Sequence, residues 1–131
     1  MERRAINPWR WQDDFDFSHA IEVRGAQRVL YCAGQTSADA DGKVMHPGDM
    51  LAQFHRALDN IGAVLGEAGL GLADVVRLNY YTTDVPAFLA AVPQVGVRLK
   101  EAGCKPSSTL LGVNRLADPD WVIEIEATAV A

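Results

Sequence analysis

Apolar and polar residues follow two different periods along the chain, and the change from one to the other predicts the order of the elements. Residues 17–23 alternate strictly between the two kinds, which is typical of a half-buried strand. Residues 29–33 form a continuous apolar run that ends at Gly34. We therefore expect a hairpin whose second strand is buried.

Two longer stretches carry apolar residues at three- and four-residue steps and predict helices. The first begins behind Asp49, a suitable N-cap, and ends at Gly69. The second begins behind Asp84 and is closed by Gly103. Pro93 lies inside this second pattern, where its missing N–H predicts a kink or an interruption.

Three further stretches, residues 75–83, 109–113 and 122–130, have the composition of strands. The predicted order is therefore β-β-α-β-α-β-β, an α+β sandwich in which two helices cover one face of a mixed or antiparallel sheet. Residues 1–16 show no period, and we expect an arm there, with an extended segment at Asn7-Pro8 that Trp9 and Trp11 pin in place. We expect this arm to pack on a neighbouring subunit, the alternative being that it covers the mouth of a cleft.

Composition narrows the class of protein. The 131 residues, 49% apolar and 22% charged, suit one globular domain spanning 1–131. A formal net charge of −5 disfavours a nucleic-acid module. No apolar run reaches the ~20 residues of a membrane span, and no signal segment is evident at the N-terminus. Cys32 and Cys104 have no metal-ligand spacing, so we expect reduced thiols and a cytoplasmic protein.

The high apolar content also predicts a partner. A domain this small has little room for both a core and an enclosed pocket. The sheet face without helices is where surplus apolar residues are expected to meet other subunits.

Three places are candidates for chemistry, although none forms a specific motif. Gly34 ends a strand where a ligand can approach the backbone closely, but a plain turn explains it equally well. Residues 106–109 bring three hydroxyl groups to a strand entry, where turn and strand-edge hydrogen bonds are the somewhat favoured explanation. Glu124 and Glu126 share one face of the last strand, either solvated or, in a cleft, able to act as general acid or base. The residues alone do not decide the function.

The same places resemble the Rid family, also called YjgF or UK114, of enamine and imine deaminases. The match runs through nearly the whole chain from Phe17, and its stretches are Cys32-Ala33-Gly34-Gln35, Gln53 to Asn60, Gly69 to Arg77, Thr83-Asp84 with Phe88, and Ile123 to Ala127. The resemblance implies a chorismate-mutase-like fold and a homotrimer with an inner β-barrel. It also implies active sites in clefts between subunits, and no cofactor.

The resemblance further implies the site residues, and it shows two departures from the family. Deaminating members bind the substrate carboxylate through an arginine in a Pro-x-Arg-Ser/Thr segment. Here Ser108 occupies the arginine position, and Phe17 replaces a family tyrosine, while Gly34 and Glu124 are retained. The implied catalytic residue is Glu124, no metal is implied, and the implied substrate-binding residues are Phe17, Ala33, Gly34, Ser107, Ser108 and Thr109.

Two functions remain open. The first is hydrolysis of a small imine or enamine that lacks this carboxylate, or that anchors it differently, through Lys105 or Arg115. The second is non-catalytic binding or regulation by a trimer that binds a small molecule in its inter-subunit cleft. Some relatives are described as endoribonucleases, but the acidic balance and the lack of a basic stripe disfavour that activity here.

Overall fold

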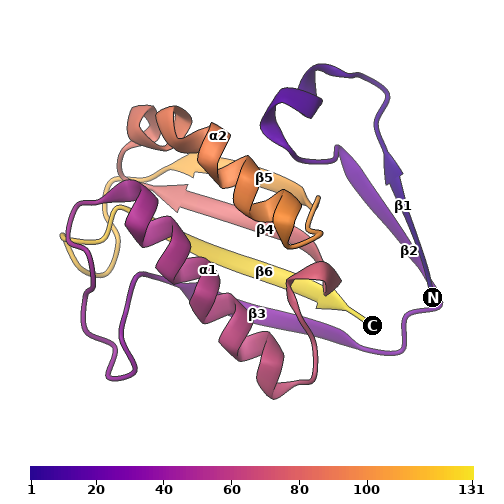
Figure 1. Cartoon of the computed structure of the whole chain (residues 1–131), viewed down its shortest axis with the longest axis horizontal. Coiled ribbons are helices and arrows are strands. Elements are labelled where there is room, and N and C mark those ends of the chain that lie inside the picture. Colours follow the sequence, from indigo (N-terminus) through magenta and orange to yellow (C-terminus); the bar gives the residue numbers. More distant parts are fainter.

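Two helices cover one face of a four-stranded sheet, and the N-terminal residues form a separate hairpin (Figure 1). The computed structural model describes all residues 1–131. Its strands and helices are β1 Glu2–Ile6, β2 Ala20–Arg24, β3 Val29–Gln35, α1 Met50–Glu67, β4 Val75–Thr82, α2 Val85–Glu101, β5 Ser107–Gly112 and β6 Ile123–Val130. Two short 3-10 helices are η1 Trp11–Phe15 and η2 Leu72–Asp74.

The four strands of the main sheet lie in the order β3-β6-β4-β5. β4 and β5 are parallel, because α2 connects them by a crossover, and the other two pairs are antiparallel. Both helices lie on the same side of this sheet (Figure 1). The predicted α+β class, with two helices on one face of a mixed sheet, is confirmed.

Both predicted helix starts are confirmed by their caps. The side chain of Asp49 accepts a hydrogen bond from the Ala52 N–H at 3.1 Å, and the cap of α2 is equivalent. The expected interruption at Pro93 is wrong, because α2 continues to Glu101. The carbonyl of Leu89 loses its amide partner, but Leu89 is 49% exposed and water can bind there. Neither helix combines the length and hydropathy that a membrane crossing requires.

The predicted hairpin between residues 17–23 and 29–33 is wrong. β2 pairs with β1 instead, in a register that runs from Glu2 opposite Arg24 to Ile6 opposite Ala20. After β2 the chain leaves this hairpin, and the amides of residues 27 and 28 donate to the carbonyl of Ala131. β3 therefore pairs with β6, at the far side of the main sheet from β5.

The expectations of an arm without regular elements at 1–16 and of a buried strand at 29–33 also need correction. The arm contains β1 and η1, so the chain has one strand more than predicted at its N-terminus. In β3 only Cys32 is buried, and Tyr31 is 79% exposed. The apolar run of β3 has no helix over its outer face, since α1 and α2 occupy the other side of the sheet (Figure 1).

Strand alternation divides the main sheet into an apolar and a polar face. Apolar residues of β4 and β6, such as Leu78, Ile123 and Ile125, are fully buried against the helices. The residues between them are polar, so the centre of the helix-free face is polar rather than apolar as expected. The large exposed apolar side chains lie mainly at β3 and in the N-terminal arm.

One buried polar side chain joins α1 to the start of β6. Gln53 is fully buried, and its Nε2 donates to the carbonyls of His46 at 2.9 Å and Asp120 at 2.7 Å. Its Oε1 accepts from the Val122 N–H at 2.9 Å. All three bonds reach backbone groups of the loops that precede α1 and β6, so this buried side chain holds those loops beside the sheet.

Candidate functional site

An apolar cavity of about 250 Å³ lies between α2, the β4–β5 pair and the N-terminal arm. Two of the predicted site residues, Phe17 and Ser108, line it together. Ser108 faces α2 because it lies in register with the buried Leu78 of β4. The remaining walls are formed by Trp11, Phe15, Asp16, Tyr80, Phe88, Leu89, Val92, Val95, Leu99, Pro106 and Leu110.

Three polar side chains reach this cavity, and none of them is used by the rest of the chain. Ser108, Tyr80 and Asp16 are among the lining residues, and no hydrogen bond or ion pair engages their side-chain oxygens. Burial, and to a smaller extent the neighbouring Cys104, raises the pKa of Tyr80 and keeps its phenol neutral. A mostly apolar cavity with a few unused polar groups is the usual form of a small-molecule site.

Gly34 and Glu124 lie together on the other face of the sheet. Glu124 alternates with the buried Ile123 and Ile125, so its side chain points to the helix-free face. A methyl group on Gly34 would lie 2.9 Å from Cδ of Glu124, so the carboxylate can take this position only beside a glycine. A β-bulge between Cys32 and Gln35 contains the exposed Ala33 and places Gly34 here.

Ser107 and Thr109 also face away from the helices, where Arg77 binds both. The guanidinium of Arg77 donates to Thr109 Oγ1 at 2.8 Å and to Ser107 Oγ at 3.4 Å. The hydroxyl of Ser107 in turn donates to the Val76 carbonyl at 3.1 Å. These contacts fit the strand-edge role that the sequence left open for the hydroxyl groups, and they also place a cation on this face.

Glu126 lies on the same face, in a hydrogen-bonded group of its own. The hydroxyl of Tyr81 donates to its Oε1, and Asn79 Nδ2 donates to the same oxygen at 3.0 Å. These two hydrogen bonds, that of Tyr81 first, hold the pKa of Glu126 below its usual range. The same bond raises the pKa of Tyr81. Glu124, by contrast, is engaged by no side-chain hydrogen bond or ion pair.

The predicted site residues therefore form separate groups within one protomer. Phe17 and Ser108 line the cavity on the helix side of the sheet, whereas Gly34 and Glu124 lie on the opposite side. Ser107 and Thr109 contact Arg77, as described, and Ala33 is exposed beside Gly34. No group of three His, Cys, Asp or Glu side chains in the structure is arranged to hold a metal ion.

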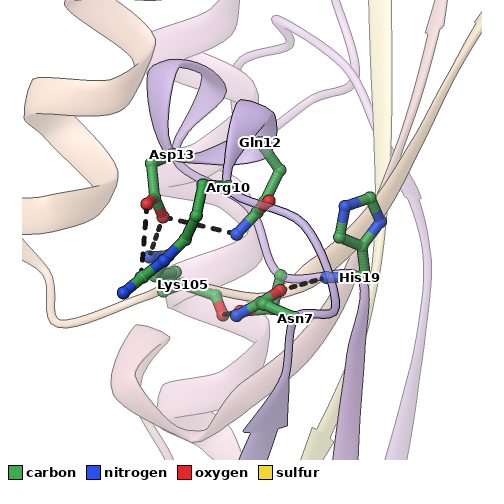
Figure 2. A network of polar contacts seen from close by, with 7 residues as sticks. Asn7, Arg10, Gln12, Asp13, His19 and Lys105 are labelled. Atoms are coloured by element: carbon green, nitrogen blue, oxygen red, sulfur yellow. Dashed lines mark hydrogen bonds and ion pairs between the residues drawn. The ribbon is translucent and has the colours of Figure 1, made fainter.

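A polar network fastens the arm at the edge of the cavity (Figure 2). Asp13 accepts from Lys105 Nζ at 3.2 Å and from Gln12 Nε2 at 3.3 Å, and Arg10 lies 3.7 Å away. The His19 N–H donates to Asn7 Oδ1 at 2.8 Å. Of the two substitute anchors expected from the sequence, Lys105 is thus paired with Asp13, and Arg115 is not among the residues that line the cavity.

Sequence reasoning missed the part that the arm plays in the cavity. Trp11 and Phe15 form one wall, so the arm covers the cavity of its own protomer. Asp16 ends η1 with a positive φ of 55° and brings a carboxylate to the same wall. The acidic cluster at 13–16 was visible in the sequence, but no spacing indicated which of its members turns inward.

Comparisons with known proteins agree with this fold over nearly the full length. The family model described as Endoribonuclease L-PSP matches residues 12–131. A RutC family protein of Pyrococcus abyssi is 34% identical over 113 residues, which cover 86% of this chain and 84% of the relative.

Two solved structures add to this comparison. The crystal structure of YyfB of Yersinia pestis, a Rid family protein of unknown function, is 41% identical, covers 100% of both chains and has a TM-score of 0.89. Escherichia coli TdcF, solved with bound serine, is 26% identical with a TM-score of 0.69, over 97% of this chain and 91% of that one. The extent of the family match and the identity to these relatives place the chain in the YjgF/Rid family.

Proposed function

We propose that this chain is a cofactor-independent hydrolase of a small imine or enamine whose binding does not depend on a carboxylate–arginine clamp. The observation that carries the proposal is the cavity beside Ser108. It is apolar, it contains three unused polar groups, and no basic side chain lines it. A carboxylate-bearing substrate would be desolvated there without a cation to pair with it, which is costly.

The proposed reaction uses water and releases ammonia. Glu124 takes a proton from water, the hydroxide adds to the C=N carbon, and the resulting carbinolamine expels its nitrogen as ammonia once that nitrogen is protonated. The C=N bond is replaced by C=O, and no electrons are exchanged with a cofactor. Enamines enter the same route after tautomerising to imines.

We further propose that the working site is completed in a homotrimer in the cytoplasm. Within one protomer, Glu124 and Gly34 lie on the sheet face opposite Ser108 and Phe17. A neighbouring protomer that presents its own Glu124 at the cavity would bring both parts together. The exposed aromatic residues of the arm and the exposed apolar residues of β3 offer surface for such a contact.

The experiment is a comparison of two imines generated in place by oxidases. One is formed from benzylamine and has no carboxylate, and the other is formed from an amino acid and carries one. Ammonia release above the spontaneous rate is expected for the first and not for the second. Glu124→Gln should abolish this release, whereas Glu67→Gln, an exposed residue at the end of α1, should leave it unchanged.

The Ser108→Arg variant tests the departure from the family directly. If the lost arginine alone explains it, this variant gains hydrolysis of 2-aminoacrylate that the unaltered chain lacks. No gain, in a variant that remains folded, would mean that other walls of the cavity also exclude this substrate.

The alternative function is non-catalytic binding of a small molecule. One observation favours it specifically, namely that Glu124 lies across the sheet from the cavity in the same protomer. It predicts that ligands raise the melting temperature by binding the native state while no imine is turned over.

A further inference from the structure

The cavity is lined by an acidic side chain, whereas a site that binds a carboxylate needs a basic one. Among the lining residues Asp16 is the only aspartate or glutamate, and no lysine, arginine or histidine is present. Two lysines near the arm do not supply a positive charge inside the cavity. Lys105 is paired with Asp13 at 3.2 Å, and Lys100 borders an outer groove together with Asp16 but makes no ion pair with it.

The backbone conformation of Asp16 and the missing side chain of Gly96 in α2 together hold Asp16 at the cavity wall. Its φ of 55° lies in the left-handed region, which aspartate and asparagine tolerate better than most residues. Its carboxyl group packs on Gly96, where a methyl group would lie 2.9 Å from Asp16 Cγ. Because Gly96 is buried inside a helix, the glycine permits an approach that any side chain would block.

Aromatic rings form much of the remaining wall. Trp11 lies edge-on to Phe17, with ring centroids 5.7 Å apart, and Tyr80 lies 5.1 Å from Phe88. Phe15 adds a fifth ring at the side of Asp16. Faces of aromatic rings attract organic cations, and a nearby carboxylate adds to that attraction.

We propose that the cavity selects small organic cations, namely a protonated amine or iminium group on an aromatic or aliphatic body. The protonated amine or iminium group binds beside Asp16, and the apolar body of the ligand fills the space beside α2. This selectivity rests on the proposed function in one respect, that the cavity is where the substrate binds. It also suits the reaction, because the protonated imine is the form of C=N that water attacks more readily.

The test uses three probes of similar size and different charge: benzylammonium, benzyl alcohol and benzoate. Their affinities for the full-length chain are measured by calorimetric titration at neutral pH. Benzylammonium is expected to bind about tenfold more tightly than benzyl alcohol, the effect of one favourable cation contact, and benzoate more weakly than either. This order can be measured in the unaltered chain and does not depend on whether a variant folds.

Three variants test whether the preference for a cation arises from Asp16 and from the cavity. Asp16→Asn keeps the shape and tolerates the positive φ, and it should lower the affinity for benzylammonium about tenfold, to that of benzyl alcohol. Asp14→Asn removes the same charge from an exposed position of the arm outside the cavity and should leave the order unchanged. Ser108→Arg should reverse the order in favour of benzoate.

The proposal is overturned if benzoate binds the unaltered chain as tightly as benzylammonium, if no probe binds at millimolar concentration, or if Asp16→Asn and Asp14→Asn act alike. Failure of the proposed hydrolase is a separate result. Cation-selective binding without ammonia release from any imine would support the binding preference and refute the catalysis.

Discussion

Replacing Gln53 by methionine should destabilise the fold more than any other change of similar shape on α1. The variant keeps the length of the side chain but loses the hydrogen bonds to His46, Asp120 and Val122, whose lengths are 2.7 to 2.9 Å. Each buried hydrogen bond contributes about 0.5–1.5 kcal/mol net, so the loss is about 3 kcal/mol. That is a large part of the roughly 5–15 kcal/mol by which domains are usually stable.

The assay is urea unfolding followed by tryptophan fluorescence, with equal protein concentrations in case subunits associate. For a slope of about 2 kcal/mol per molar urea, the midpoint should fall by about 1.5 M. Gln94→Met is the matched control, because Gln94 is exposed on α2 and forms no side-chain hydrogen bond, and it should change stability by less than about 0.5 kcal/mol. A loss below about 1 kcal/mol for Gln53→Met would refute the reasoning.

Two further variants and one labelling experiment test the polar face and the buried thiol. The hydrogen bond from Tyr81 holds the pKa of Glu126 below its usual 4.5, so this bond stabilises the fold above about pH 4.5 and is lost as the pH falls. Between roughly pH 5 and pH 3, the Tyr81→Phe variant should therefore lose less stability than the unaltered chain. Urea unfolding midpoints at each pH measure the difference. Burial raises the pKa of Cys104 to about 12. A disulfide reagent at about pH 8 should therefore leave this thiol unmodified until urea is added. Rapid labelling of Cys104 in the folded chain would contradict its burial. Gly34→Ala should displace the Glu124 carboxylate and reduce ammonia release as Glu124→Gln does, with a stability change below about 1 kcal/mol because a flexible side chain gives way; full activity would show that this contact is not needed.

The elements that local chemistry determines could be predicted from the sequence. Asp49 and Asp84 each precede a helical period, and the structure shows both as caps. The partner of a strand is decided differently. β2 has the alternation of a hairpin strand, but its partner is β1, whose mostly charged and polar sequence shows no apolar alternation. Long-range contacts fix the position of β1, and one of them is the hydrogen bond from the Arg3 guanidinium to the Ala73 carbonyl at 2.6 Å.

The candidate site shows the same division. The importance of Ser108 followed from the resemblance, because a residue that departs from a family motif is visible in a sequence. The role of Asp16 was not visible, because it depends on Gly96, a residue 80 positions later, and on the positive φ at the end of η1. No period or spacing connects two such residues, and only the packing of the arm against α2 brings them into contact.

The position of β3 at the border of the main sheet bears on the tendency of the chain to aggregate. Its outer N–H and C=O groups have no strand beside them, and the side chains of Val29 and Tyr31 leave it uncharged along that border. Natural proteins usually protect such a border with charges, proline or a covering segment, because it can recruit any extended chain. The chain therefore carries a template for strand addition, which another extended chain can use wherever no partner covers it.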